Sequence, residues 1–128
     1  MLKRLKTADM IKIYHNPRCR KSRAGLDFLK TNNFDFEVID YFKNTLTEVQ
    51  IKQLIKKTGL AVEEMIRKQE IDYKQNFKGK TLSDEQWITQ IAANPKLLKR
   101  PIVEIEKSAI LADPPENILR LLHPHNSK

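Results

Sequence analysis

The side chain with the clearest chemical potential is the thiol of Cys19, the only cysteine among the 128 residues. It lies in the stretch YHNPRCRKSRAG, Tyr14 to Gly25, where arginine and lysine residues flank it and His15 precedes it by four positions. Positive groups lower the pKa of a thiol and favour the thiolate, which is the nucleophilic form. A lone cysteine is more often a buried, inert apolar residue, but these basic neighbours argue against an apolar pocket. We therefore expect a reactive thiol.

A positive setting of this kind also binds oxyanions. A nucleophile and an anion site in one loop predict attack by sulfur on the central atom of an oxyanion, or on a disulfide. Cys19 is followed by Arg20-Lys21-Ser22, so no Cys-x-x-Cys pair exists and a thioredoxin-type dithiol reaction is excluded. An external thiol, such as glutathione or a glutaredoxin-like protein, must then restore Cys19. His15 either stabilises the thiolate or positions the substrate, or is simply a solvated residue at a strand end.

The elements around the loop predict how the thiol is placed. Ile11–Tyr14 has the alternating pattern of a strand, Asn16-Pro17 is typical of a turn, and a helix is expected from about Lys21 to Asn32. A second strand with period two follows at Phe34–Ile39, which completes a βαβ unit with a right-handed crossover. Cys19 then precedes a helix N-terminus, where unpaired N–H groups and the helix dipole favour an anion.

The middle of the chain is predicted to be helical. Capping-box patterns at Thr47–Gln50 and Ser83–Gln86 each precede a helical apolar face, with Gly59 expected to end the first helix and a short helix expected over Val62–Lys68. Two strands, Ile102–Ile105 and Ala109–Ala112, form a predicted hairpin, and Pro114-Pro115 opens a last helix. The apolar face of that helix comprises Ile118, Leu119, Leu121 and Leu122.

The order βαβ, helices, ββα predicts an α/β fold. We expect a thioredoxin-like, mixed four-stranded sheet with an all-helical insertion at about residues 44–98. Residues 11–124 are expected to form a single domain, and residues 1–10 a poorly ordered N-terminal extension.

Composition agrees with a globular protein, since 40% of residues are hydrophobic and 31% are charged. No apolar run reaches the length of a membrane span, no signal sequence is evident, and a lone thiol suits the reducing cytoplasm, so we expect a cytoplasmic location without membrane association. The net charge of +8 indicates an anionic partner. Nucleic acid is the weakest choice, because no recognised binding motif accompanies the charge.

The motif Ile-x-Ile-Tyr-His-Asn-Pro-x-Cys-x-x-Ser-Arg, from Ile11 to Arg23, resembles the glutaredoxin-coupled arsenate reductases. The segments Met65–Lys68 and Leu97–Val103 are similar to the Arg-Lys and Leu-x-x-Arg-Pro-Ile signatures of that family. The resemblance spans about Ile11 to Leu122 in the same order, which supports the predicted fold.

The resemblance implies specific roles for individual residues. Cys19 is the implied nucleophile, which attacks arsenate and forms a thiol–arsenate adduct. Arg67 and Arg100 are the implied oxyanion ligands, and the implied cis-proline is Pro101. The residues implied to favour the thiolate are His15, Asn16 and Ser22. Glutathione is implied as co-substrate and glutaredoxin as partner, with no bound cofactor or metal.

Asp113 departs from the family pattern. The arsenate reductases carry a third arginine where this chain has Asp113, immediately before Pro114. A carboxylate that points inward repels an oxyanion, whereas one that caps the last helix does not. Arg18 or Arg20 can substitute for the missing contact only if their side chains point toward the site.

Two alternative functions stay open at this stage. One is an Spx-like transcription regulator, which has the same fold and binds the α-subunit of RNA polymerase; many such regulators carry the Cys-x-x-Cys pair that is absent here. The other is a glutathione-dependent thiol reductase with a substrate other than arsenate, which Asp113 motivates.

Overall fold

The computed structural model describes residues 10–122 of the chain. The expected extension therefore lies outside the described residues except for Met10, which is exposed and directly precedes the first strand. Residues 123 and 124 of the expected domain lie outside them as well, so the expected domain limits stay predictions.

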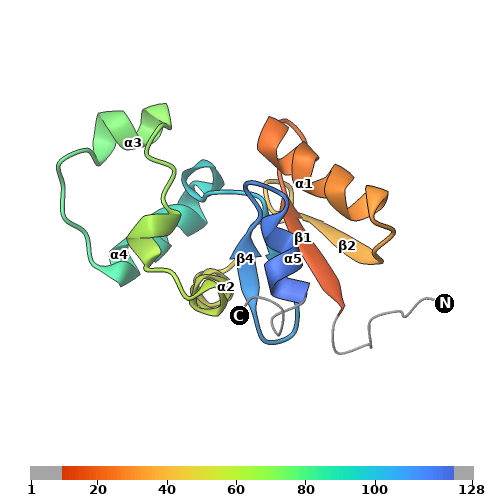
Figure 1. The fold of residues 1–128 in the computed structure, drawn as a ribbon. Helices are drawn as coiled ribbons and strands as arrows, with labels where there is room; N and C mark the ends of the chain where they lie inside the picture. Colours follow the sequence, from red (N-terminus) through yellow and green to blue (C-terminus); the bar gives the residue numbers. More distant parts are fainter. Residues whose placement is uncertain (1–9, 123–128) are drawn as a thin grey trace.

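A mixed four-stranded sheet forms the centre of the fold (Figure 1). The first two strands pair in parallel, and the other two pairs are antiparallel. This confirms the predicted sheet. Its spatial order is β2-β1-β3-β4, with bounds β1 (Ile11–His15), β2 (Phe36–Asp40), β3 (Ile102–Glu104) and β4 (Ala109–Leu111).

The second strand is shorter than predicted and lies at the edge of the sheet. It begins at Phe36 rather than Phe34, and the side chain of Val38 is 44% exposed. The predicted strand with period two is therefore present from Phe36 onward, but Val38 in it is not buried. The physical reason is that an edge strand has a neighbour on one side only, so its outer residues are covered incompletely.

One face of the sheet packs against α1 (Arg20–Thr31) and α5 (Asn117–Leu122). The last helix begins at Asn117, after a turn in which the Asn117 N–H bonds to the Pro114 carbonyl at 3.0 Å, and not at the proline pair as predicted. Leu119 is 41% exposed, which corrects its predicted place on the apolar face: in this short helix the buried positions are three apart. The core of this face comprises Ile11, Ile13, Leu29, Val103, Ala112, Ile118 and Leu121.

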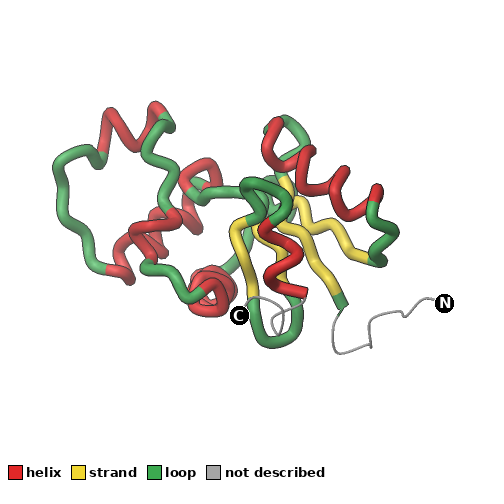
Figure 2. Tube along the Cα trace, in the orientation of Figure 1, coloured by secondary structure: helices red, strands yellow, loops and turns green. Residues whose placement is uncertain are grey.

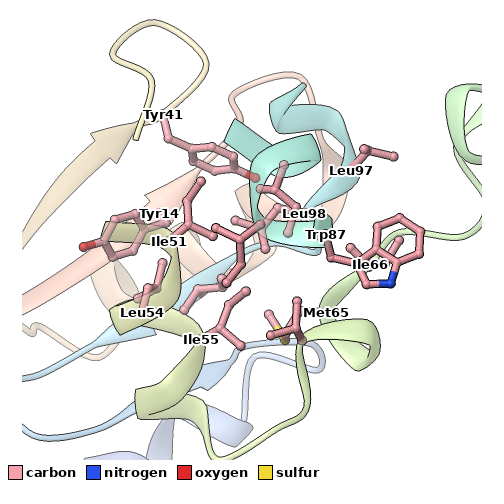
Figure 3. Close-up of a cluster of buried hydrophobic side chains, with 14 of the residues drawn as sticks. Tyr14, Tyr41, Ile51, Leu54, Ile55, Met65, Ile66, Trp87, Leu97 and Leu98 are labelled. Carbon is pink, nitrogen blue, oxygen red and sulfur yellow. The ribbon is translucent and has the colours of Figure 1, made fainter. Parts of the chain in front are cut away.

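The segment between β2 and β3 contains the helices α2 (Glu48–Thr58), α3 (Ile71–Asn76) and α4 (Asp84–Ala93) and lies to one side of the sheet (Figures 1 and 2, drawn in the same orientation). Both predicted capping boxes are present, at Thr47 before α2 and at Ser83 before α4. Gly59 ends α2 in the left-handed conformation with φ 75°. Figure 3 shows the apolar cluster that joins this segment to Tyr14 of the sheet.

The chain between α2 and α4 differs most from the prediction. The helix expected over Val62–Lys68 is only the 3₁₀ turn η2 (Val62–Met65), after which Ile66 is extended and pairs with Leu98. A helix that was not predicted, α3 (Ile71–Asn76), follows, and a second 3₁₀ turn, η3 (Pro95–Leu97), precedes β3. The Ile66–Leu98 pairing holds two distant parts of the sequence side by side.

Among the described residues, no helix has both the length and the apolar character that crossing a membrane requires.

Candidate active site at Cys19

Cys19 is the N-cap residue of α1, as its position before the predicted helix indicates. Its backbone is extended, its N–H donates to the Asn16 carbonyl at 2.9 Å, and its carbonyl accepts from the Arg23 N–H at 3.0 Å. The thiol makes no side-chain hydrogen bond of standard capping geometry. It nevertheless lies at the end of the helix where N–H groups are unpaired and the dipole is positive.

The surroundings of the thiol lower the pKa of Cys19 below its ordinary value. Partial burial raises this pKa, but hydrogen bonding by the Ser22 backbone, the Arg100 side chain, the Lys21 backbone and the Ser22 side chain lowers it by more. The thiolate is therefore favoured both by the local helix end and by an arginine from a distant part of the chain.

Ser22 and Asn16 shape the loop that carries the thiol. Ser22 is fully buried, and its hydroxyl accepts the Asn16 N–H at 3.3 Å. The Asn16 side-chain oxygen accepts the Arg18 N–H at 3.1 Å, which is the local turn that asparagine commonly forms. Ser22 acts on the thiol directly, whereas the bonds of Asn16 define the path of the loop.

His15 ends β1 in a buried position, and its Nδ1 atom has no hydrogen-bond partner. Burial lowers the pKa of His15, and the charges of Arg23 and Lys30 lower it further, against the raising effects of the Ser22 backbone and Asp40. The imidazole is thus neutral near pH 7. Any effect of His15 on the thiolate must come from its orientation and hydrogen bonding, because it carries no positive charge.

Arg67 and Arg100 lie close together although they are far apart in the sequence. The Ile66–Leu98 pairing is extended by two backbone bonds, Arg67 N–H to the Leu97 carbonyl at 2.7 Å and Lys99 N–H to the Met65 carbonyl at 2.9 Å. Arg67 and Arg100 therefore leave this paired segment near each other, and the Arg100 side chain contributes to the lowered pKa of the Cys19 thiol.

The guanidinium of Arg100 is buried and held on several sides. Its Nη1 donates to the carbonyls of Lys96 at 3.0 Å and Leu98 at 3.3 Å, and its central carbon lies 5.5 Å from the centre of the Phe42 ring. Its Nε has no hydrogen-bond partner in the described structure. Contacts of this kind fix the orientation of the planar group while leaving Nε free to bind a further acceptor.

The Arg100–Pro101 peptide bond is cis, as expected from the family resemblance. Pro101 packs against α1 so closely that a Cβ atom added to Gly25 would lie 2.9 Å from its Cγ. Glycine at position 25 thus allows the helix that carries the thiol to approach the cis-proline. The Asp113–Pro114 bond is cis as well, a feature that the sequence pattern does not indicate.

A cleft of about 370 Å³ lies beside the arginines. Asp113 points into it and pairs with Lys21 at 3.0 Å, so its carboxylate faces the site and does not cap α5. Arg18 and Arg20 are exposed and do not line this cleft, so they do not replace the family's third arginine there. The cleft is lined by Lys21, Arg67, Gln69, Lys99, Arg100, Leu111 and Asp113.

Two residues near the site were missed by the sequence analysis. Glu70 accepts a hydrogen bond from Arg67, and its Oε2 atom lies 3.7 Å from the Nη2 atom of Arg100. Tyr41 is buried, and its hydroxyl has no partner in the described structure. Burial raises the pKa of Tyr41, and its hydroxyl experiences the charges of Arg100, Cys19 and Arg67. The sequence signal was its place directly after a parallel strand, at the same edge as the Cys19 loop.

Comparison with known proteins identifies the family. A protein-family model described as the ArsC family matches residues 14–121. The chain belongs to the ArsC family. Over 114 residues this ArsC-family chain is 39% identical to the uncharacterized protein YfgD of Escherichia coli (strain K12), a match that covers 88% of this chain and 96% of that protein.

Relatives that are named as arsenate reductases match about the same share of this ArsC-family chain as YfgD does. It is 37% identical over 114 residues to an arsenate reductase of Neisseria meningitidis serogroup B (strain MC58), covering 88% of this chain and 97% of that protein. The structure of an arsenate reductase from Vibrio cholerae superimposes with a TM-score of 0.83 at 36% identity, covering 89% of this chain and 98% of that one.

Proposed function

We propose that the chain reduces arsenate to arsenite through the Cys19 thiolate. The observation that carries this proposal is the placement of Cys19 at the N-terminus of α1, where a buried arginine that lines a cationic cleft, Arg100, helps to lower the pKa of the thiol. Because several relatives are named as arsenate reductases, we propose arsenate as the oxyanion substrate.

In the first step the Cys19 sulfur attacks the arsenic of arsenic acid, H₃AsO₄. One As–OH oxygen leaves as water, taking a proton from the reactants, and an As(V)–S bond forms. The guanidinium groups of Arg67 and Arg100 hold the remaining oxygens, because a planar fork binds two oxygens at once and keeps its charge.

In the second step glutathione attacks the Cys19 sulfur. The electron pair of the S–As bond leaves with arsenic, which becomes As(III) and is released as arsenious acid, H₃AsO₃. Cys19 is left in a mixed disulfide with glutathione.

The chain has no other cysteine, so a second thiol, from glutathione or glutaredoxin, must reduce this disulfide. The overall reaction converts arsenic acid and two glutathione molecules to arsenious acid, water and oxidised glutathione. A compartment that keeps thiols reduced, such as the cytoplasm, suits this cycle.

In this proposal the loop residues keep the thiolate available. Ser22 stabilises the thiolate through its backbone N–H and its hydroxyl, and Asn16 maintains the loop that positions Cys19. His15 contributes as a neutral ring, and Pro101 presents the backbone of the Arg100 segment to the thiol.

A second candidate substrate follows from one observation, the carboxylate of Asp113 inside the cleft. It removes one positive contact and leaves Lys21 paired. In this second candidate, the substrate of the same thiol is a mixed disulfide or another anion, with glutathione again as reductant.

The test is an assay of purified protein with glutathione, glutaredoxin and arsenate, in which arsenite is measured directly. We expect turnover that depends on both thiol components and is abolished in Cys19→Ser, with thermal unfolding showing that the variant is folded. Arsenite formation no greater than in the Cys19→Ser control contradicts the proposal. Rapid formation of a glutathione mixed disulfide in that case favours the second candidate.

A further inference from the structure

The carboxylate of Glu70 lies between the two guanidinium groups proposed to bind the oxyanion. Its Oε2 atom accepts from Nη1 of Arg67 and lies 3.7 Å from Nη2 of Arg100. All three side chains are largely buried, with exposed fractions of 19%, 18% and 6%. Salt and water therefore screen these interactions less than they screen a surface ion pair.

The backbone of Glu70 places this carboxylate at the start of α3. Glu70 is the N-cap residue of that helix, yet its side chain makes no capping bond and turns instead toward the arginines. An N-cap side chain normally accepts a hydrogen bond from an unpaired N–H at the start of its helix. The Glu70 side chain instead contacts the arginines of the anion site. A carboxylate and a tetrahedral oxyanion present oxygens to an arginine fork in the same way, so both require the same N–H groups.

Glu70 already faces the two N–H groups through which the arginines approach each other, Nη1 of Arg67 and Nη2 of Arg100. Nη1 of Arg100 is already bonded to two backbone carbonyls, whereas Nη2 faces Glu70. The cleft and its border carry four cationic side chains against the carboxylates of Asp113 and Glu70. An oxyanion that bridges the arginines through Nη1 of Arg67 and Nη2 of Arg100 must therefore share these donors with Glu70 or replace it.

We propose that Glu70 is an internal ligand of the oxyanion site and is displaced when the substrate binds. Anions that bind arginine no better than a carboxylate does are thereby kept out, and Glu70 sets the affinity threshold of the site. This inference rests on the proposed role of Arg67 and Arg100 as oxyanion ligands. The chemical class that overcomes the threshold is a tetrahedral dianion able to contact both guanidinium groups.

The opposite role for Glu70 is that of a clamp. In that case its carboxylate stays in place and orients the two arginines, so its removal weakens oxyanion binding. The two roles predict changes of opposite sign in the affinity for an oxyanion, which makes them separable without any measurement of turnover.

The experiment measures sulfate binding by isothermal titration calorimetry for the wild-type protein, Glu70→Gln and the control Glu63→Gln. Sulfate is a tetrahedral dianion that the thiol cannot reduce. Glu63 pairs with Lys68 on the surface, where both side chains are more than half exposed, so this control removes the same charge away from the cleft. We expect Glu70→Gln to bind sulfate about tenfold more tightly than wild type, the scale of one charged hydrogen bond, and Glu63→Gln to match wild type.

A second measurement uses the wild-type protein and does not depend on how Glu70→Gln folds. We expect the ¹³C resonance of the Glu70 side-chain carboxylate to shift as sulfate is added, while that of Glu63 stays constant. Unchanged or weaker sulfate binding by folded Glu70→Gln, a stationary Glu70 resonance, or the absence of sulfate binding in both proteins overturns the inference.

Failure of the inference is distinguishable from failure of the proposed function. Tighter sulfate binding by Glu70→Gln in a protein that forms no arsenite supports the inference while the proposed reaction fails. If the wild-type protein forms arsenite but Glu70→Gln does not bind sulfate more tightly, the proposed reaction is supported and the inference about Glu70 fails.

Discussion

The thiol loop and the arginine cleft both favour a negative charge, but they do so by different means. In the loop, backbone N–H groups of Lys21 and Ser22 and one hydroxyl act on Cys19 from within three residues of it. In the cleft, Arg67 and Arg100 come from segments that meet only through the Ile66–Leu98 pairing. Stabilisation of a negative charge in the loop thus depends on the local backbone conformation. In the cleft it depends on the tertiary structure and on the charges of the side chains.

Arg100 belongs to both regions, so changing it should have the largest effect. Arg100→Lys keeps the charge but loses the planar fork, and with it the contacts to the thiol and to the oxyanion. We expect kcat/KM for arsenate to fall about 100-fold, the size seen when one preorganised donor is removed. Steady-state kinetics checks this, with the exposed Arg120→Lys as a control that retains wild-type activity. If kcat/KM of Arg100→Lys falls less than threefold, Arg100 does not couple the thiol loop to the arginine cleft.

The next effect concerns the packing that holds the two regions together. Gly25→Ala places a methyl group 2.9 Å from Pro101, and we expect a loss of about 1–3 kcal/mol in the free energy of unfolding from this overpacking. Alanine otherwise stabilises a helix relative to glycine. An increase in stability measured by urea unfolding therefore contradicts the close contact between α1 and Pro101.

A smaller change, confined to the loop, is expected for Ser22→Ala. Loss of the hydroxyl removes one group that lowers the pKa of Cys19, so the thiolate fraction at neutral pH decreases. The midpoint of Cys19 alkylation should move to higher pH, and the rate at pH 7 should fall several-fold. Sulfate affinity, a property of the cleft, should stay the same; a parallel loss of sulfate affinity would show that the loop and the cleft are one unit.

The smallest effect is expected at the border of the cleft. Lys21 and Asp113 form a pair whose side chains are 54% and 36% exposed, and such pairs contribute little. Asp113→Asn frees Lys21 and removes a negative charge, so we expect KM for arsenate to fall about two- to threefold. A rise in KM for arsenate would contradict a repulsive effect of the Asp113 carboxylate on the oxyanion.

The same contrast explains what could be predicted from the sequence. The sheet, the capped helices α2 and α4, and the position of Cys19 before α1 follow from periodicity, capping residues and turn residues within short windows. The exposure of Val38 and Leu119 was not predictable in this way, because it depends on which elements cover an edge strand or a short helix.

The cleft was predictable only in part. Arg67 and Arg100 were identified through family resemblance, since nothing in the local sequence indicates that they meet. Glu70 was missed because a helix of six residues, α3, gives too weak a pattern to predict, and its partner Arg100 is remote in sequence. The direction of Asp113, and the exclusion of Arg18 and Arg20 from the cleft, likewise required the three-dimensional structure.

The most direct test of the central claim is the pH dependence of Cys19 alkylation, measured with and without arsenate. Because the folded protein lowers the pKa of Cys19, the rate should rise with pH through a midpoint below that of a free cysteine, about 8.5. Arsenate should slow the alkylation by occupying the site beside the thiol. A midpoint at the free-cysteine value together with no protection by arsenate contradicts an oxyanion site built around a stabilised thiolate.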